Sequence, residues 1–509
     1  MRIAIRSDSG TQVGGGHVMR CLSLAMAARD AGHEVQFVCA EVDGHIGDRI
    51  AKSGFDVSWL SVKDLPSPGG NIESWRPMRV AQDAEQTIAA LQDVSPDWII
   101  LDHYGLGGAW VKAVRAALPG LRILALDDLD REPLFADLLL NPAAFPDTPI
   151  SQPHMAMLKG PVHALLRPEF RALRSDALKR RTGEVKSVLI LPGMVDNLGF
   201  GAAALAAMRD LPDLKAEVVM GSQSPSVPQI EALVANVPNW SLTLDATDMA
   251  ERLQAADLAI GAGGVSAWER CCLGLPAVNV ALAENQQPGV QAIANTGAAI
   301  GLDVSALQNP TQIASALKTL MADYQAFSQN AADLCDGNGA ARVISAMSGS
   351  LRPVTLDDAK LIFDWRNQDH IREASLNSEP LILENHVAYL EKVLTDPENH
   401  LWCIYREDGT DLGLTNAKRQ EDGSWVWGYY IGASPAPKGA GRRMLVHFLR
   451  RLNETPGFTE VEATVLAANP RSRAIHEALG FRLKSDKPAR ELHLRLDAAT
   501  LHERLGTGE

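Results

Sequence analysis

Cysteines, long apolar runs and excess positive charge are all scarce in this sequence. Its six cysteines form no C-x-x-C pair and show no zinc-ligand spacing, so we expect reduced thiols and no metal site. No segment approaches the roughly 18 consecutive apolar residues of a membrane span, and the opening residues MRIAIRSDSG lack an apolar signal core. These absences predict a cytoplasmic protein that does not contact a membrane.

Basic residues are outnumbered by acidic ones, and the formal net charge is −14. This balance gives no overall basic surface for nucleic acid, although local basic loops are compatible with it. We therefore expect small-molecule partners. The length of 509 residues, with 46% hydrophobic and 22% charged residues, is typical of a globular protein of two to four domains.

Short apolar runs alternate with helical patterns through the first two thirds of the chain, which predicts parallel sheets in an α/β architecture. The runs RIAIR, EVQFVCA, DWIILD and RILALDD form a first series, and a second series begins at KSVLILPG. Between them, the stretch 139–153 is rich in proline and polar residues and indicates a linker or a crossover. We predict Rossmann-type domains at residues 1–150 and 151–345.

The composition changes after residue 350, which predicts a third domain at residues 350–509 with mixed helices and strands. Its segments HLWCIYRED, SWVWGYYIG and EVEATVLAAN have strand character. Because composition shifts usually mark boundaries that few contacts cross, we expect this domain to fold by itself.

Three consecutive glycines, Gly14 to Gly16, stand directly before His17 where a strand leads into a helix. Glycines at such a position let an anionic ligand approach backbone N–H groups and the positive end of the helix. The spacing differs from the dinucleotide fingerprint, so NAD is disfavoured. A histidine in the first helical turn can act as a general base, and the spacing alone is equally compatible with a packing role.

The first two domains resemble the family of nucleotide-sugar hydrolases that release 2,4-diacetamido-2,4,6-trideoxy-L-altrose for pseudaminic acid. Six motifs carry this resemblance in order along the chain. They are RSDSGTQVGGGHVMRCLSLA (6–25), LDHYGLGGAW (101–110), ALDDLDREPLFADLLLNP (125–142), HALLRPEF (163–170), GAGGVSAWERCCLGLP (261–276) and ENQ (284–286).

The resemblance implies a GT-B-like pair of Rossmann-type domains that cleaves a UDP–sugar bond with water and no metal. It makes His17, Tyr104 and Asn285 the catalytic positions, and it places Glu269 at the ribose hydroxyls of UDP. A solvated helix residue is the alternative for Glu269. The other substrate-binding positions that it implies are Arg6, Asp8, Gly14, Gly15, Gly16, Arg20, Gly263, Gly264 and Gln286.

The turn LPGMVDNLGF departs from this family, which has a glycine-rich polar turn there. Pro192 replaces a glycine and removes an N–H donor, and Met194 and Val195 stand where polar residues are expected. Phosphate contacts from this turn are therefore in doubt, with Asp196 and Asn197 as candidates to compensate.

The third domain resembles the GCN5-related N-acetyltransferase (GNAT) fold, an α+β architecture. Its loop PKGAGRR implies that acetyl-CoA is bound by Lys438, Gly439, Ala440, Gly441 and Arg442, and the pattern from Asn469 to Phe481 matches the adjacent helix of that fold. Ala436 departs from the family loop, which has Gln or Arg there.

Two residues of this domain are candidates for proton transfer. His476 stands where many family members carry a tyrosine that protonates the CoA thiolate, and a hydrogen-bonded structural histidine is the alternative. Glu462 is the candidate base for the amine, although glutamates on strands are often simply exposed.

Together the resemblances predict consecutive steps, in which a UDP-4-amino-4,6-dideoxy-sugar is N-acetylated and the product is hydrolysed to release UDP. Three alternatives remain open. The first two domains can be a GT-B glycosyltransferase, the GNAT-like domain can be an appendage without turnover, and the substrate can be a precursor of another nonulosonic acid.

Overall fold

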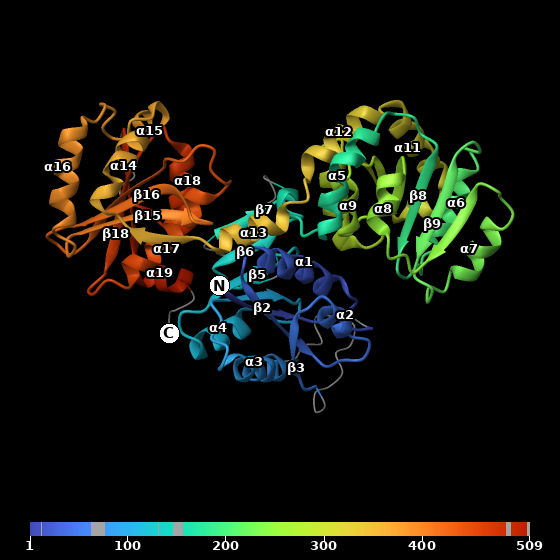
Figure 1. Ribbon diagram of the computed structural model, residues 1–509, viewed down its shortest axis with the longest axis horizontal. Coiled ribbons are helices and arrows are strands. Elements are labelled where there is room, and N and C mark those ends of the chain that lie inside the picture. Colours follow the sequence, from blue (N-terminus) through green and yellow to red (C-terminus); the bar gives the residue numbers. More distant parts are fainter. Residues whose placement is uncertain (12, 63–76, 131, 146–155, 485–489, 506–509) are drawn as a thin grey trace.

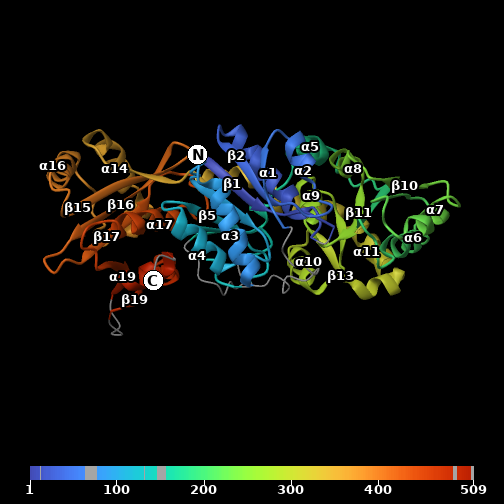
Figure 2. The same ribbon diagram turned by 90° about the horizontal axis from the view of Figure 1, so that it is seen from below.

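The computed structural model describes residues 1–11, 13–62, 77–130, 132–145, 156–484 and 490–505. It consists of three parts, each built around one β-sheet, with the first part lying between the other two (Figures 1 and 2). No helix in this described portion is long and apolar enough to cross a membrane.

The first part is a seven-stranded parallel sheet in the order β3-β2-β1-β4-β5-β6-β7. Its strands are buried apolar runs because helices cover both faces of a parallel sheet. The strand order reverses between β1 and β4, and ligands of open α/β sheets bind outside the carboxyl ends of the strands at such a point. The strands are β1 (Arg2–Ser7), β2 (Glu34–Ala40), β3 (Asp56–Leu60), β4 (Trp98–Asp102), β5 (Arg122–Leu126), β6 (Leu138–Asn141) and β7 (Ala156–Lys159). The helices are α1 (Gly16–Asp30), α2 (Gly47–Lys52), α3 (Pro77–Leu91) and α4 (Gly108–Ala117).

The first sheet extends past the predicted boundary at residue 150, because it continues to β7. Strand β6 occupies the start of the stretch that the sequence indicated as a linker, and β7 pairs with it in parallel. Leu139, Leu140 and Leu158 are buried, so both strands belong to the apolar core despite the prolines between them. Residues 146–153 of the predicted linker lie outside the described residues.

The second part is a six-stranded parallel sheet in the order β10-β9-β8-β11-β12-β13. This confirms the prediction of a second Rossmann-type domain. Its strands are β8 (Ser187–Gly193), β9 (Lys215–Met220), β10 (Trp240–Leu244), β11 (Leu258–Ala262), β12 (Ala277–Ala281) and β13 (Ala299–Asp303). Its helices are α5 (Pro168–Arg180), α6 (Phe200–Met208), α7 (Val227–Val234), α8 (Met249–Ala255), α9 (Ser266–Cys272), α10 (Gln287–Asn295), α11 (Pro310–Ala322) and α12 (Tyr324–Leu334), with 3-10 turns at Pro161–His163, Glu284–Gln286 and Val304–Gln308.

The third part is a mixed sheet in the order β14-β15-β16-β17-β18-β20-β19, in which only the β17–β18 pair among these strands is parallel. This confirms the predicted α+β domain. Its strands are β14 (Ser350–Pro353), β15 (His400–Glu407), β16 (Thr410–Arg419), β17 (Trp425–Ile431), β18 (Glu460–Leu466), β19 (Arg482–Leu483) and β20 (Glu491–Asp497). Its helices are α14 (Ala359–Arg366), α15 (Asp369–Glu373), α16 (Leu383–Leu394), α17 (Ala440–Asn453), α18 (Pro470–Leu479) and α19 (Ala498–Leu505), with a 3-10 turn at Leu356–Asp358.

Helix α13 (Gly339–Met347) leads from the second part to the third, and it packs on α1 of the first part (Figure 1). One continuous cluster of buried apolar side chains includes Leu22 of α1, Val343 of α13 and Leu445 of α17. The boundary near residue 350 is therefore crossed by a shared core, contrary to the expectation that few contacts cross it.

Buried charges lie at the same junction. The carboxylate of Asp137, in the first part, accepts from Arg115 Nη2 at 2.9 Å and also pairs with Arg450 of α17. Arg122 donates from Nη1 to the carbonyl oxygen of Gly349 at 3.3 Å. The first and third parts are thus joined by apolar packing and by paired charges.

Candidate functional site

The histidine that follows the glycine loop lies at the strand-order reversal of the first sheet, where β1 and β4 end side by side. His17 is in the first turn of α1, and Asp102 is the last residue of β4. His17 Nδ1 lies 2.7 Å from Asp102 Oδ1. Because a carboxylate only accepts, this contact places the proton on Nδ1 and leaves the Nε2 lone pair available.

Arg20 completes the support of this pair from the next turn of α1. Its Nη2 and Nε donate to Asp102 Oδ1 and Oδ2, each at 2.6 Å. Burial alone would raise the pKa of Asp102, but Arg20 and then His17 outweigh it and hold that pKa well below its ordinary value. Asp102 is therefore a buried anion, whereas the His17 side chain keeps 12% of its surface exposed and can meet a ligand.

A second carboxylate, Asp128, joins Tyr104 to the same group. Tyr104 donates its hydroxyl to Asp128 Oδ1 at 2.6 Å, and Arg20 Nη1 lies 3.2 Å from Asp128 Oδ2. The Tyr104 ring meets the His17 ring edge-on at a centroid distance of 4.6 Å. Burial, followed by the charge of Asp128, raises the pKa of Tyr104, so its hydroxyl keeps its proton. The structure thus brings together His17, Tyr104 and Arg20 as expected, around two carboxylates that sequence reasoning missed.

The glycine loop is more closed than expected. Gly14, at φ +75°, donates its N–H to the carbonyl of Gly10 at 2.8 Å, so this N–H is not available to a phosphate. Gly15 precedes the helix and Gly16 begins it. Side chains at Gly14 and Gly16 would meet no atom within 4 Å, so the space beside the loop is open.

Arg6 and Asp8, predicted to contact substrate, are buried and paired within the first part. Arg6 is only 1% exposed, and its guanidinium forms ion pairs with both Asp8 and Asp83. Asp8 also accepts from the Ala40 N–H at 2.7 Å and faces His103 Nε2 at 3.1 Å. The charged groups of both residues are thus bonded to partners inside the first part, where they hold the loop that follows β1.

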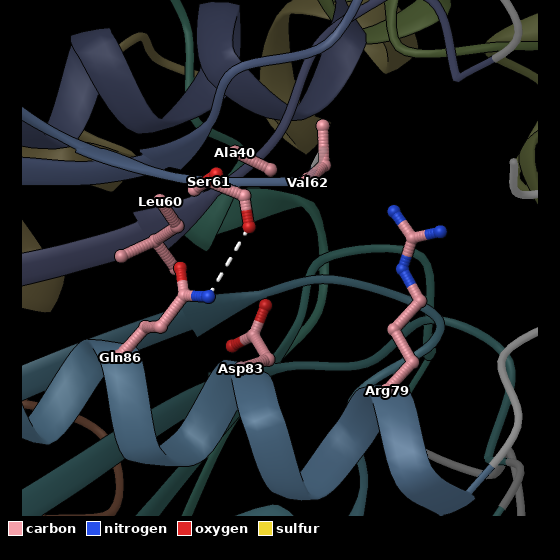
Figure 3. A pocket seen from close by; sticks show the side chains of 7 residues that line it. All are labelled: Ala40, Leu60, Ser61, Val62, Arg79, Asp83 and Gln86. Carbon is pink, nitrogen blue, oxygen red and sulfur yellow. Dashed lines mark hydrogen bonds between the residues drawn. The ribbon is translucent and has the colours of Figure 1, made fainter. Parts of the chain in front are cut away.

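A small cavity beside this buried group is not a substrate site. Figure 3 shows Arg79, Asp83 and Gln86 rising from α3 toward the end of β3, where Gln86 donates to the Ser61 carbonyl at 3.2 Å. The volume of the cavity is about 10 Å³, which is room for about one water molecule.

In the second part, Glu269 lies on α9, whose side of this part faces the first part in both views (Figures 1 and 2). Its Oε1 lies 3.3 Å from Arg167 Nη2, and Arg167 also pairs with Glu169 at 3.0 Å. Burial raises the pKa of Glu269, and the charge of Arg167 opposes that shift. Arg167 bonds one carboxylate oxygen, Oε1, and a carboxylate has further lone pairs that can accept from a ligand hydroxyl.

Only some of the residues predicted to bind substrate near Glu269 have groups that are open to a ligand. Gly263 donates its N–H to the Val280 carbonyl at 3.0 Å, so that group is not free for a phosphate, whereas the position of Gly264 is open. Gln286 accepts from the Leu282 N–H at 3.0 Å through its Oε1. Asn285 lies in the 3-10 turn Glu284–Gln286, and its side chain is outside what the structure describes.

In the turn LPGMVDNLGF, which departs from the hydrolase family, Asp196 has a structural role. Asp196 is buried and accepts from the N–H groups of Phe200 and Gly201 at 2.9 Å each, so it caps α6 instead of replacing lost phosphate contacts. Met194 and Val195 are exposed.

In the third part, a cleft of about 710 Å³ opens where two strands separate. Strands β17 and β18 pair only from Trp425 to Trp427, and beyond that point Tyr429 and Val465 line the cleft instead of bonding across it. Backbone groups at such an opening are available to an extended ligand.

The loop before α17 forms one end of this cleft. Lys438, Gly439, Ala440, Gly441 and Asn469 all line it as expected, whereas Arg442 is not among the described residues that do. Gly439 takes a left-handed conformation at φ +82°, and no side chain caps the helix, so its first N–H groups can face an anion. Arg443 donates from Nη1 to the Lys438 carbonyl at 3.0 Å and pairs with the buried Glu407, which holds the loop in place.

His476 lines the cleft, but both ring nitrogens already have partners. Nδ1 lies 2.8 Å from the Ser472 carbonyl, so it donates, and Nε2 accepts from the Trp427 indole N–H at 3.2 Å. Burial lowers the pKa of His476, opposed by the Ser472 carbonyl. In this tautomer the Nδ1 proton is held by the Ser472 carbonyl and Nε2 carries none, so the geometry favours the structural alternative for His476.

Glu462, the candidate base for the amine, lies away from the cleft lining. It pairs with Lys484 and is not among the described residues that line the cleft. The structure instead shows Tyr429, whose hydroxyl lies 3.1 Å from Ser472 Oγ, with both residues lining the cleft. The sequence did not single out this tyrosine. The strand SWVWGYYIG contains two adjacent tyrosines, and the strand register decides which of them faces the cleft.

No metal site is evident in the part of the chain that the structure describes, since no three His, Cys, Asp or Glu side chains are grouped to hold an ion. All six cysteines are free and buried.

Comparisons with known proteins divide the chain in the same way. Residues 213–346 match the glycosyltransferase family 28 C-terminal domain, and residues 350–482 match the acetyltransferase (GNAT) domain. The spore coat polysaccharide biosynthesis protein SpsG of Bacillus subtilis is 24% identical over 275 residues, which are 52% of this chain and 80% of that protein.

Two further similarities are to a hydrolase and to a crystal structure. The UDP-2,4-diacetamido-2,4,6-trideoxy-beta-L-altropyranose hydrolase of Campylobacter jejuni is 28% identical over 145 residues, 28% of this chain and 43% of the hydrolase. The crystal structure of Acinetobacter baumannii MurG is 18% identical with a TM-score of 0.49, over 67% of this chain and 97% of MurG. The two family models thus match adjoining segments of the chain, the glycosyltransferase family 28 C-terminal domain within residues 213–346 and the GNAT domain within residues 350–482.

Proposed function

We propose that this chain carries out two consecutive steps on one sugar nucleotide. The GNAT part transfers acetyl from acetyl-CoA to the amine of a UDP-4-amino-4,6-dideoxy-sugar. The first two parts then release UDP from UDP-2,4-diacetamido-2,4,6-trideoxy-L-altrose by hydrolysis. The observation that carries the hydrolytic step is the His17–Asp102 pair at the strand-order reversal, together with the similarity to the Campylobacter hydrolase.

In the hydrolytic step, His17 Nε2 accepts a proton from water while the water oxygen bonds to the anomeric carbon of the sugar. The bond from that carbon to the diphosphate oxygen breaks, and UDP leaves with the electron pair. Asp102 keeps the imidazole in the required tautomer and stabilises the imidazolium that forms. Glu269 holds the ribose hydroxyls of UDP, and the open backbone at Gly264 faces the diphosphate.

In the acetyl transfer, the sugar amine attacks the thioester carbonyl and the carbon–sulfur bond breaks. Tyr429 gives its hydroxyl proton to the departing thiolate. The amine loses a proton to solvent, and solvent returns a proton to Tyr429. Burial raises the pKa of Tyr429, so its hydroxyl carries a proton at neutral pH. Lys438 and the N–H groups at the start of α17 bind the CoA pyrophosphate.

The test follows both steps in the full chain, with acetyl-CoA and the UDP-4-amino-sugar supplied together. We expect CoA release first and UDP release only after acetylation. His17→Ala should still bind UDP and release CoA, but its UDP release should fall by about 10²- to 10⁴-fold, the usual contribution of a general base. Unchanged UDP release from a folded His17→Ala protein contradicts the hydrolytic assignment.

The family 28 match favours a second candidate, in which the first two parts transfer the sugar to an acceptor other than water. Free sugar formed in buffer without any added acceptor contradicts this alternative. Analysis of that sugar's stereochemistry also decides between the proposed precursor and that of another nonulosonic acid. A cytoplasmic location, where UDP-sugars and acetyl-CoA are both available, is part of the same proposal.

A further inference from the structure

The cleft of the GNAT part passes from one face of its sheet to the other. Helices α17 and α18 pack on the face that carries Trp427, whose ring stacks on Phe448 at 6.3 Å and on Phe481 at 5.1 Å. Helices α14 and α16 pack on the opposite face, where Tyr430 joins their apolar cluster. Since neighbouring residues of a strand point to opposite faces, the opening between β17 and β18 connects a CoA side with a second side bordered by α14 and α15.

The described residues that line this cleft include no aspartate or glutamate. They do include Lys438 and Arg471 on the CoA side and Arg366 and His370 on the second side. This is notable in a chain whose formal net charge is −14. A cleft with cations at both ends and no carboxylate in its described lining favours anionic ligands at both ends and disfavours a polycationic amine.

Arg366 is the best placed cation on the second side. Its Nη2 donates to the Asn377 carbonyl at 2.5 Å, which holds the guanidinium, while its buried Nη1 has no hydrogen-bond partner. Burial lowers the pKa of Arg366, Tyr430 opposes that shift, and the neighbouring Arg372 adds to it. Arg372 has its own partner, Asp369, at 2.6 Å. An oxyanion beside Arg366 would supply both the missing acceptor and the missing negative charge.

We propose that Arg366, together with His370, binds the diphosphate of the nucleotide-linked amino sugar, so that the cleft accepts nucleotide-linked amines and rejects free or polycationic ones. This inference rests on the proposed acetyltransferase function and names the part of the acceptor that the second side of the cleft recognises. CoA and the nucleotide then enter from opposite faces of the sheet, with the thioester and the amine meeting at the opening between β17 and β18.

The experiment compares acetyl transfer to three acceptors in the full chain carrying His17→Ala, which prevents loss of the nucleotide. The acceptors are the UDP-4-amino-sugar, the same amino sugar without UDP, and the aminoglycoside kanamycin. We expect strong preference for the UDP-linked acceptor and competitive inhibition by UDP against it. Arg366→Gln should raise KM for the UDP-linked acceptor by at least about tenfold, which corresponds to one hydrogen bond to a charged group, and should leave KM for acetyl-CoA unchanged.

Arg372→Gln is the matched control, because it removes a neighbouring positive charge that is not among the described lining residues. It should change KM for the UDP-linked acceptor less than about twofold, as expected for an exposed ion pair. Equal use of the free amino sugar or kanamycin overturns the inference, as does an unchanged KM in Arg366→Gln, while the proposed function stands in both cases. Acetyl-CoA binding without acetylation of any acceptor overturns both.

Discussion

His17 Nδ1 lies 2.7 Å from Asp102 Oδ1, and this contact joins the first turn of a helix to the end of a buried strand. The two residues are 85 positions apart in the chain, yet parallel pairing of β1 with β4 brings their strand ends together. A neutral imidazole with its Nδ1 proton held by a carboxylate presents Nε2 as a base. The chemistry proposed for the first part therefore depends on Asp102 as much as on His17.

Asp102→Asn tests this dependence directly. The amide can donate to Nδ1 and favour the other tautomer, which takes the lone pair away from Nε2. We expect UDP release to fall by about 10²- to 10⁴-fold, comparable to loss of the base, while UDP still binds. Steady-state kinetics and calorimetry measure the two effects. A variant with normal turnover would show that the orientation of His17 does not matter to the reaction.

Glu269→Ala tests the nucleotide site of the second part. If this carboxylate accepts the ribose hydroxyls, UDP binding should weaken by about 1.5–3 kcal/mol, the range of hydrogen bonds to a charged group. Glu169→Ala is the control, since Glu169 also pairs with Arg167 but its side chain is 41% exposed. Calorimetry should find nearly unchanged affinity for the control. Equal affinities for Glu269→Ala and wild type would reject the role.

The apolar runs RIAIR, EVQFVCA, DWIILD and RILALDD identified β1, β2, β4 and β5, because an unbroken apolar run is typical of a strand buried on both faces. The shorter or more polar strands β3, β6 and β7 of the same sheet were not predicted. The sequence also identified His17, since a glycine loop before a helix is a local pattern. Asp102 could have been suspected as a polar residue ending the strand DWIILD, and the loop of Tyr104 follows it directly.

Local motifs could not show those features that depend on partners far along the chain. Arg6 matches a motif, but Asp83 of α3 saturates it, and no local pattern reveals that partner. His476 matches a catalytic position, but the Trp427 indole occupies its second nitrogen. The shared core at residue 350 was missed because composition shifts mark sequence changes and say nothing of the surfaces that dock afterwards.

His476→Gln separates the structural role of this residue from an acid role. Glutamine can donate and accept hydrogen bonds but cannot supply a proton, so acetyl transfer should stay within about threefold of wild type, whereas loss of a true general acid costs about 10²- to 10⁴-fold. Tyr429→Phe is the contrasting variant. It should lower kcat, because the departing CoA thiolate then has no side-chain hydroxyl at this position to protonate it. A large loss in His476→Gln, with CoA binding and folding intact, would return the acid role to the histidine.

Asp137→Asn probes the junction of the first and third parts. The substitution removes the charge that faces both Arg115 and Arg450, and breaking such a buried group typically costs about 3–5 kcal/mol. Asp364→Asn serves as the control, because Asp364 pairs with Lys360 on an exposed helix surface and should cost well under about 1 kcal/mol. Denaturant unfolding measures both. Similar small losses would show that the junction charges do not hold the two parts together.

The same junction should make the protein sensitive to acid through His447 of α17. Burial, with Arg122 and Arg443 close by, lowers the pKa of His447 to about 3, from an ordinary value of about 6.5. The unfolded chain therefore binds a proton between these values when the folded protein does not, so the contribution of His447 to stability is complete above about pH 6.5 and decreases as the pH falls toward 3. Between pH 6.5 and pH 5, wild type should lose up to about 2 kcal/mol relative to His447→Leu, which cannot titrate. Unfolding free energies of the two proteins across this range provide the measurement, and parallel pH profiles would show that His447 is free to accept a proton in the folded junction.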